Sequence, residues 1–165
     1  MVISIRRSRP DEGDKLTAIW CRSVDATHDF LTKAYRKELE EMVRAFLPEA
    51  PLWVAVNTED QPLAFMLLTG DHMDALFVDP DVRGCGVGKL LIEHALSLTP
   101  KLTTNVNEQN EQAVGFYQKM GFRVTGRSET DDLGQPYPLL NLIHEQQAAC
   151  CRENDAVPDH GRDLW

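Results

Sequence analysis

The chain has 165 residues and a formal net charge of −9, with 42% hydrophobic and 26% charged residues. These proportions are typical of one globular domain, and the longest apolar runs fall far short of the roughly 20 residues that cross a membrane. The acidic balance argues against a nucleic-acid partner, which needs a basic surface. It suits a cationic partner such as an amine, or simply a well-solvated surface.

The N-terminal segment and the cysteines predict a cytoplasmic protein without a metal site. Residues 1–7 lack the basic and then apolar layout of a secretory signal. Cys21 and Cys85 stand alone, while Cys150 and Cys151 are adjacent, so no C-x-x-C or Cys/His metal spacing occurs. Reduced thiols fit this pattern.

In chain order, apolar periodicity first predicts a strand, two helices and three further strands. We expect Asp11 to cap the first helix, and a polar segment at Ser23–Asp29 to lead into the second, which Pro48 ends. The expected elements are a strand at Val2–Arg6, a helix with Leu16, Ile19 and Trp20 on one face, a helix with Leu39, Met42, Val43, Phe46 and Leu47 on one face, and strands at Leu52–Val56, Leu63–Leu68 and His72–Val78.

A glycine-rich loop then leads into the second half of the chain. The expected elements are a helix through Val87, Leu90, Leu91 and Leu98, a strand at Leu102–Val106, a helix at Ala113–Met120 closed by Gly121, and strands at Phe122–Gly126 and Leu139–Ile143. The order β-α-α-β-β-β-α-β-α-β-β predicts an α/β fold in which helices flank a mixed central sheet with a parallel crossover. One domain at residues 1–145 and a disordered tail at 146–165 are expected.

The loop from residue 83 to residue 89 has the chemistry of a phosphate site. Gly84, Gly86 and Gly88 lack side chains where a strand turns into a helix, so backbone amides can face a ligand at the positive end of the helix dipole. Arg83 and Lys89 add positive charge. The spacing differs from the dinucleotide fingerprint G-x-G-x-x-G, and no Gly-Lys-Ser/Thr occurs. A flexible turn without a ligand is the alternative.

Two motifs resemble those of the GNAT acetyltransferases. Arg83-Gly84-Cys85-Gly86-Val87-Gly88 is similar to the Q/R-x-x-G-x-G/A signature, and residues 110–122 resemble the N-x-x-A-x-x-F-Y-x-x-x-G-F block. The resemblance covers Leu63–Phe122. It implies a GNAT-type fold, acetyl-CoA as co-substrate, and direct acetyl transfer within a ternary complex to a primary amine, either a protein lysine or N-terminus or a small molecule. The alternative is a non-catalytic acetyl-CoA sensor or regulatory module.

The resemblance also implies where acetyl-CoA binds. The glycine loop would hold the pyrophosphate, the strand before it would pair with the pantetheine arm as an added strand, and an amide near Leu76 would polarise the acetyl carbonyl. Asn110 matches an asparagine that contacts the same arm. The expected cofactor-binding residues are Leu76, Phe77, Val78, Arg83, Gly84, Cys85, Gly86, Val87, Gly88, Lys89, Asn110 and Tyr117. For Cys85 we expect a small loop residue and not a covalent nucleophile.

Tyr117 is the expected general acid. It matches the family tyrosine that protonates the departing CoA thiolate, and a phenol with an ordinary pKa of about 10 keeps its proton at neutral pH. The alternative is that Phe116 and Tyr117 are a packed aromatic pair, and for Phe116 core packing is what we expect.

Three further residues are candidates for the acceptor side of the site. His72 is a candidate base, because histidine side chains titrate near neutral pH, and it lies where some family members carry a catalytic glutamate. Asp74 shares its strand face and would orient His72 or bind a cationic substrate. His28 lies in a segment that lines the acceptor cleft in the family. The alternatives are a solvent-facing His72, and a loop in which Thr27 or Asp29 caps the second helix. Neither the acceptor amine nor the oligomeric state follows from the sequence.

Overall fold

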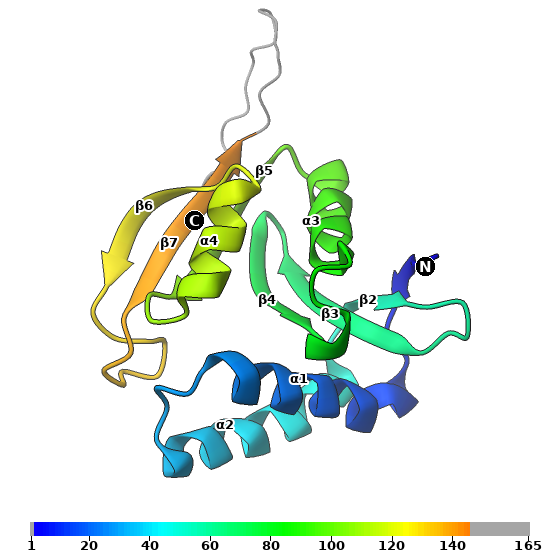
Figure 1. Cartoon of the computed structure of the whole chain (residues 1–165), viewed down its shortest axis with the longest axis horizontal. Coiled ribbons are helices and arrows are strands. Elements are labelled where there is room, and N and C mark those ends of the chain that lie inside the picture. The colour runs from blue at the N-terminus through cyan, green and yellow to red at the C-terminus, as the bar shows by residue number, and fades with distance from the viewer. Residues whose placement is uncertain (1, 146–165) are drawn as a thin grey trace, which may run out of the picture. The chain divides into compact units, whose positions relative to one another are not determined.

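The computed structural model describes residues 2–145, and the predicted tail at 146–165 lies outside the described residues. Within residues 2–145 the strands and α-helices follow one another in the predicted order, joined in places by short 3₁₀ turns (Figure 1). Their bounds are β1 Ser4–Arg7, α1 Gly13–Thr27, α2 Lys33–Phe46, β2 Trp53–Val56, β3 Pro62–Thr69, β4 His72–Val78, α3 Val87–Leu98, β5 Lys101–Asn107, α4 Glu111–Lys119, β6 Arg123–Ser128 and β7 Leu139–Glu145.

The strands are hydrogen-bonded in the order β1-β2-β3-β4-β5-β7-β6. β4 and β5 pair in parallel, whereas the pairs β1–β2, β2–β3, β5–β7 and β6–β7 are antiparallel. A parallel pair requires a crossover connection, which α3 provides. The predicted α/β fold with a mixed sheet is therefore confirmed.

The chain forms two compact units. The first consists of residues up to Leu68 together with Ala75–Ile92, and the second consists of Thr69–Asp74 together with the described residues from Glu93 onward. We describe each unit by itself.

The core of the first unit lies between α1 and strands β2 and β3. Leu16 and Ile19 on α1 are each 1% exposed, as the apolar periodicity predicted, and they belong to one buried cluster with Val54 and Phe65. Full burial of such a side chain contributes about 1.5 to 3 kcal/mol. The ring of Phe65 also lies 5.6 Å from that of Phe77, so β4 is tied to the same core.

The ends of the first two helices differ from the prediction. Asp11 lies in a 3₁₀ turn that precedes α1 and does not cap it. The predicted polar loop at Ser23–Asp29 is helical as far as Thr27, whose hydroxyl donates to the Ser23 carbonyl at 2.8 Å. Thr32, and neither Thr27 nor Asp29, caps α2, because its hydroxyl accepts a hydrogen bond from the amide three residues later.

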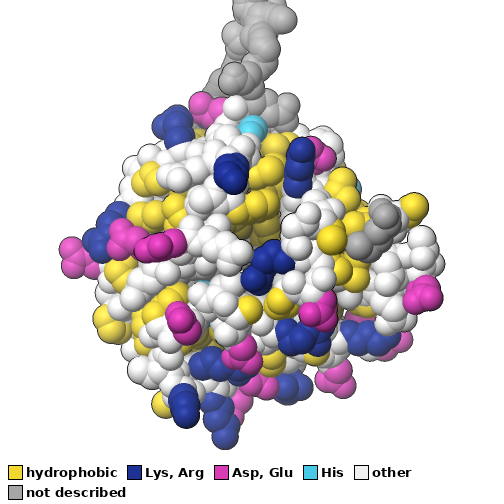
Figure 2. Space-filling model, viewed as in Figure 1, with side chains coloured by type: hydrophobic (Ala, Val, Ile, Leu, Met, Phe, Trp, Pro, Cys, Tyr) yellow, Lys and Arg dark blue, Asp and Glu magenta, His cyan; other side chains and the backbone are white. Residues whose placement is uncertain are grey.

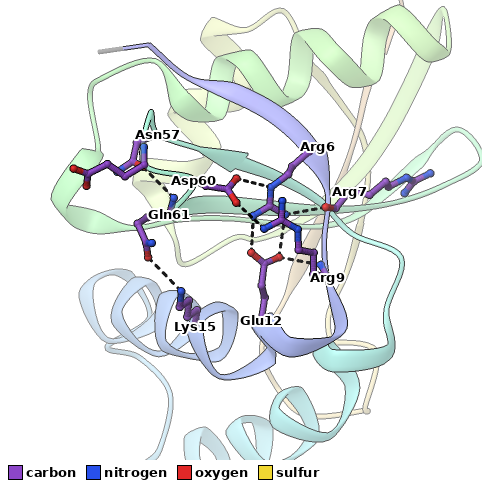
Figure 3. A network of polar contacts seen from close by, with 9 residues as sticks. Arg6, Arg7, Arg9, Glu12, Lys15, Asn57, Asp60 and Gln61 are labelled. Atoms are coloured by element: carbon purple, nitrogen blue, oxygen red, sulfur yellow. Dashed lines mark hydrogen bonds and ion pairs between the residues drawn. The ribbon is translucent and has the colours of Figure 1, made fainter.

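A buried carboxylate fixes the start of α1 (Figure 3). Glu12 is 5% exposed and accepts hydrogen bonds from two guanidinium nitrogens of Arg6, at 2.6 and 3.1 Å, and from the Arg9 amide at 2.9 Å. Arg6 and Arg9 also bind Asp60 in the turn between β2 and β3, at 2.9 and 2.6 Å. The hydrogen bond from Arg6 is the main reason that the pKa of Glu12 lies below its usual value.

Substituting this carboxylate is expected to weaken the first unit. Glu12→Gln should lower the free energy of unfolding by about 2 to 3 kcal/mol at neutral pH, because the mostly buried Arg6 guanidinium keeps only Asp60 of its two carboxylate partners. A lowered carboxyl pKa stabilises the fold above the usual pKa of glutamate, so the difference from wild type should shrink as the pH falls through that range. Urea titrations at several pH values measure this difference.

The matched control for that measurement is Glu59→Gln, because Glu59 is exposed in the turn between β2 and β3. An exposed substitution of this kind should change stability by less than about 0.5 kcal/mol. Equal stability of the Glu12→Gln protein and the control would contradict the assigned role of the buried carboxylate.

Charged side chains dominate the outer surface of α2. Figure 2 shows acidic and basic side chains mixed over α1 and α2. Leu39 and Val43 pack partly against the core, but Met42 and Phe46, which were expected on the same apolar face, are 46% and 51% exposed. No described helix has both the length and the apolarity to cross a bilayer.

In the second unit, β5 alternates strictly between buried and half-buried positions. Leu102 and Val106 are buried, as is Leu142 on the neighbouring β7. The intervening residues of β5 are polar, and among them Asn105 donates a hydrogen bond to Asn141 across the β5–β7 pair. One face of this part of the sheet is therefore mostly apolar, with the buried Thr104 hydroxyl bonded to the Met73 carbonyl, and the other carries hydrogen-bonding side chains.

Candidate active site

Two of the three glycines in the loop before α3 have a left-handed backbone conformation. Gly84 and Gly86 have φ angles of 86° and 84°, in the left-handed region that L side chains rarely adopt. A Cβ atom added at either position would meet nothing within 4 Å. Glycine is therefore required by the backbone angle and not by lack of space.

The amides of the loop fall into two groups. Those of Arg83 and Cys85 turn back into the loop and donate to the Pro80 and Val82 carbonyls, at 3.2 and 3.1 Å. Within residues 2–145 no acceptor is found for the amides of Gly84, Gly86, Val87 and Gly88. These four amides lie at the N-terminus of α3, where the helix dipole favours an anion. With the exposed Arg83 and Lys89 beside them, they suit a diphosphate.

An ion pair anchors the start of this loop to α1. Asp79 is 8% exposed, and its carboxylate binds Arg22 at 2.5 Å and accepts the Asp81 amide at 3.0 Å. Burial acts to raise the pKa of Asp79, but the Arg22 guanidinium and the Asp81 amide outweigh it, so the pKa lies below its usual value. Asp79 therefore stays ionised and holds the turn that precedes Gly84.

The strand before the loop supplies the other predicted cofactor contacts in the first unit. Leu76, Phe77 and Val78 are all half-buried in β4. The Phe77 ring lies 6.4 Å from that of Trp20 and 5.6 Å from that of Phe65. The Phe77 side chain therefore packs against the core of the first unit.

Tyr117 lies in α4 of the second unit and is 6% exposed. Its ring makes edge contacts with Phe116 and Phe122, at centroid distances of 5.4 and 5.3 Å. Burial raises the pKa of Tyr117 well above its usual value, so the phenol keeps its proton at any physiological pH. Phe116, for which core packing was expected, is only half-buried.

Asn110 caps α4. Its side-chain oxygen accepts a hydrogen bond from the Ala113 amide at 3.2 Å, and the residue is 8% exposed. The predicted cofactor contact therefore coincides with a structural role, and the side-chain nitrogen is the part of Asn110 suited to a ligand.

His72 and Asp74 are brought together at the start of β4. The Nε2 atom of His72 lies 3.5 Å from an oxygen of Asp74, and its Nδ1 atom lies 2.7 Å from the Thr103 hydroxyl. The Thr69 hydroxyl donates to the other oxygen of Asp74 at 2.5 Å. The side chain of His72 is 18% exposed and that of Asp74 is 40% exposed. His72 is therefore partly exposed, and each of its ring nitrogens faces a polar group.

His28 follows the last residue of α1. Its Nδ1 atom lies 2.7 Å from the Thr27 hydroxyl, and its ring lies 5.2 Å from that of Phe30. Burial lowers the pKa of His28 to about 4, so the imidazole is neutral at physiological pH. It can offer a substrate a hydrogen bond or an aromatic surface, but not a positive charge.

The neutral His28 is expected to make the fold sensitive to acid. Its pKa falls from 6.5 to about 4 on folding, so stability is complete above pH 6.5 and is lost as the pH falls towards 4. The loss should reach about 2 to 3 kcal/mol, because each pKa unit corresponds to about 1.4 kcal/mol. Urea midpoints measured between those pH values should fall less steeply for His28→Gln. An equal fall of the urea midpoint with pH in the wild-type and His28→Gln proteins would contradict this prediction.

The predicted residues are divided between the two units. The glycine loop, Leu76–Val78 and His28 belong to the first, whereas Asn110, Tyr117, His72 and Asp74 belong to the second. Sequence reasoning did not assign roles to Arg22, Thr69 and Thr103. The threonine-rich composition of the β5 segment was the one available signal, and nothing local marks Arg22.

Comparisons with known proteins agree with this geometry. A family model described as "Acetyltransferase (GNAT) domain" matches residues 19–136. The chain is 78% identical over 144 residues to the peptidyl-lysine N-acetyltransferase YjaB of Escherichia coli (strain K12), a match that covers 87% of this chain and 98% of that protein. The solution structure of apo-form YjaB from Escherichia coli superimposes with a TM-score of 0.85, at 78% identity and the same coverage of the two chains.

A more distant structure shares the fold alone. The PaiA N-acetyltransferase of Thermoplasma acidophilum, solved in complex with coenzyme A, has a TM-score of 0.72 at 17% identity and covers 88% of this chain and 100% of its own. The chain belongs to the GNAT acetyltransferase family. It is an N-acetyltransferase, and the comparisons give no support to the alternative of a non-catalytic sensor.

Proposed function

We propose that this N-acetyltransferase takes its acetyl group from acetyl-CoA and transfers it directly to lysine side chains of proteins or peptides. GNAT enzymes use acetyl-CoA, and the relative that is 78% identical is named for its action on peptidyl-lysine. The observation that carries the proposal is the set of unpaired amides at the start of α3, among residues 84–88. A location in the cytoplasm stays a prediction.

In this proposal the cofactor is held mainly by backbone groups. The open amides, with Arg83 and Lys89, bind the pyrophosphate. The pantetheine arm pairs with the Leu76–Val78 segment, where main-chain hydrogen bonds align the thioester without needing particular side chains. The Asn110 side-chain nitrogen contacts the same arm. An amide near Leu76 stabilises the negative charge that develops on the acetyl oxygen.

The transfer step needs a neutral amine and a protonated leaving group. The neutral amine nitrogen attacks the thioester carbon and loses a proton to solvent, the C–S bond breaks, and the sulfur leaves as a thiolate. Tyr117 donates its phenolic proton to that sulfur, which yields CoA and an amide, and solvent returns a proton to the phenol. The raised pKa of Tyr117 supports this role, because the phenol is in its acid form before each turnover.

The acceptor amine is a cation in water, with a pKa of about 10. We assign Asp74, an exposed carboxylate of the second unit, to its recognition, and His72 lies beside that carboxylate. His28 is assigned to the acceptor side of the first unit as a neutral group.

Two measurements test the proposal. Calorimetry should show acetyl-CoA binding, and a free-thiol release assay should show turnover with lysine peptides above that with polyamines or aminoglycosides. Mass spectrometry of the peptide should place the acetyl group on the lysine Nζ atom. A protein that binds neither CoA nor acetyl-CoA would overturn the proposal. Turnover restricted to small amines would overturn its lysine part.

A further inference from the structure

Four polar side chains form a continuous row at the start of β4. The Thr103 hydroxyl lies 2.7 Å from His72 Nδ1, His72 Nε2 lies 3.5 Å from Asp74, and Asp74 accepts the Thr69 hydroxyl at 2.5 Å. All four residues belong to the second unit. In the order Thr103–His72–Asp74–Thr69 the two inner groups each have a partner on either side, and this order limits the positions of the hydrogen-bonding protons.

The carboxylate favours one tautomer of the imidazole. An ionised carboxylate only accepts hydrogen bonds, so the ring nitrogen that faces it is favoured to carry a proton. In the neutral imidazole the other nitrogen then accepts, and the Thr103 hydroxyl donates to it. That hydroxyl also lies 3.4 Å from the Asp71 carbonyl, but its contact with His72 is the shorter one. His72 in this tautomer has no lone pair left to remove a proton from an amine.

The parallel pairing of β4 with β5 sets the position of Thr103. His72 and Thr103 are register partners, and the Thr103 amide donates to the Asp71 carbonyl at 2.9 Å. Two backbone constraints therefore place the hydroxyl beside the ring. Threonine is also stiff at χ1, which limits the directions that the hydroxyl can take.

Exposure decides which member of the row meets a substrate. The side chain of Asp74 is 40% exposed, whereas that of His72 is 18% exposed. We propose that the Asp74 carboxylate binds the ammonium group of the acceptor, and that His72 and Thr103 are positioning residues that act through Asp74. This inference rests on the proposed lysine acetyltransferase function. It keeps substrate binding, one of the two roles expected for Asp74, and replaces the role of base expected for His72.

A double-mutant cycle tests this order of action. Asp74→Asn should raise the KM for a lysine peptide about 10- to 100-fold at saturating acetyl-CoA, as expected for loss of a charged hydrogen bond. Thr103→Val keeps the β-branched shape and removes the hydroxyl, and it should raise the same KM by about 3- to 10-fold. In the Asp74→Asn background Thr103→Val should have no further effect. Thr103→Ser should restore the wild-type KM.

The controls separate positioning from folding. Thr125 lies exposed on β6, so Thr125→Val is a matched substitution. It should leave the KM for the lysine peptide unchanged in both the wild-type and the Asp74→Asn background. Acetyl-CoA affinity, measured by calorimetry, should be the same in all these variants. A fall in kcat from Thr103→Val that persists in the Asp74→Asn background would make His72 the proton acceptor and overturn the inference. No effect of Thr103→Val in either background would overturn it as well.

A spectroscopic measurement tests the row without any turnover. In ¹H–¹⁵N spectra the His72 ring, assigned by its loss in His72→Gln, should carry its proton on Nε2. Thr103→Val should shift its ¹⁵N signals. A proton on Nδ1 of the neutral ring would contradict the inference. Failure of the wild-type protein to acetylate any lysine peptide would instead refute the proposed function, and the ring signals would still report on the row.

Discussion

Tyr117→Phe is expected to lower kcat by about 100- to 10,000-fold, the usual contribution of general acid catalysis. The substitution removes one hydroxyl from a ring that is packed against Phe116 and Phe122, so the fold should persist. Acetyl-CoA affinity should stay close to that of wild type, because the proton is needed only as the C–S bond breaks. Single-turnover rates measure the fall in the rate of acetyl transfer, and calorimetry measures the retained affinity for acetyl-CoA.

The pH dependence of the same reaction provides a second readout. Because burial raises the pKa of Tyr117 above its usual value of 10, the wild-type rate should not fall near pH 10 through loss of this proton. Tyr137→Phe is a suitable control, since Tyr137 is another buried tyrosine of the second unit, at 9% exposed. A kcat for Tyr117→Phe equal to that of the control would remove Tyr117 from the mechanism and leave the family membership untouched.

Gly86→Val is expected to weaken acetyl-CoA binding by about 10- to 100-fold. A β-branched residue at a φ of 84° costs about 1 to 3 kcal/mol, so we expect the loop to adopt another conformation in which its amides are displaced. At saturating acetyl-CoA, kcat should be largely retained, since the acid and the acceptor groups are unchanged. Calorimetric titration with acetyl-CoA and with CoA measures the loss.

Gly115→Ala is the matched control for that substitution. Gly115 lies within α4, and a Cβ atom there meets nothing within 4 Å. Alanine in place of a helical glycine should stabilise the protein by about 0.5 to 1 kcal/mol and leave acetyl-CoA affinity unchanged. Unaltered binding in Gly86→Val would show that the loop does not hold the pyrophosphate.

Local sequence patterns were sufficient to predict the elements of the fold. Apolar periodicity on α1 and strict alternation on β5 depend on neighbouring residues, and both are found in the structure. The start of α1 was missed because Glu12 is held by Arg6, a partner from another element whose position no local pattern reveals. The start of α2 was missed because Thr32 caps this helix, whereas Thr27 and Asp29 nearby also have side chains that are suited to capping.

Prediction of the candidate site was limited in the same way, because some of its contacts join residues that are distant in the sequence. The glycine loop was predictable, since positive φ angles are almost a property of glycine itself. That Arg83 and Cys85 turn their amides inward depends on the 3₁₀ turn before the loop and could not be predicted from the motif. The contact between His72 and Thr103 depends on strand register across a crossover, which composition does not determine.

The pair formed by Arg22 and Asp79 has a consequence for redesigning acceptor preference. Arg22 lies in the last two turns of the helix that delivers His28, and Asp79 begins the turn that ends in the glycine loop. An exchange that rotates the end of this helix is therefore expected also to displace the turn before the glycine loop. Libraries that alter acceptor choice should vary positions after residue 28 and keep Arg22, so that gains in selectivity are not offset by lost cofactor affinity.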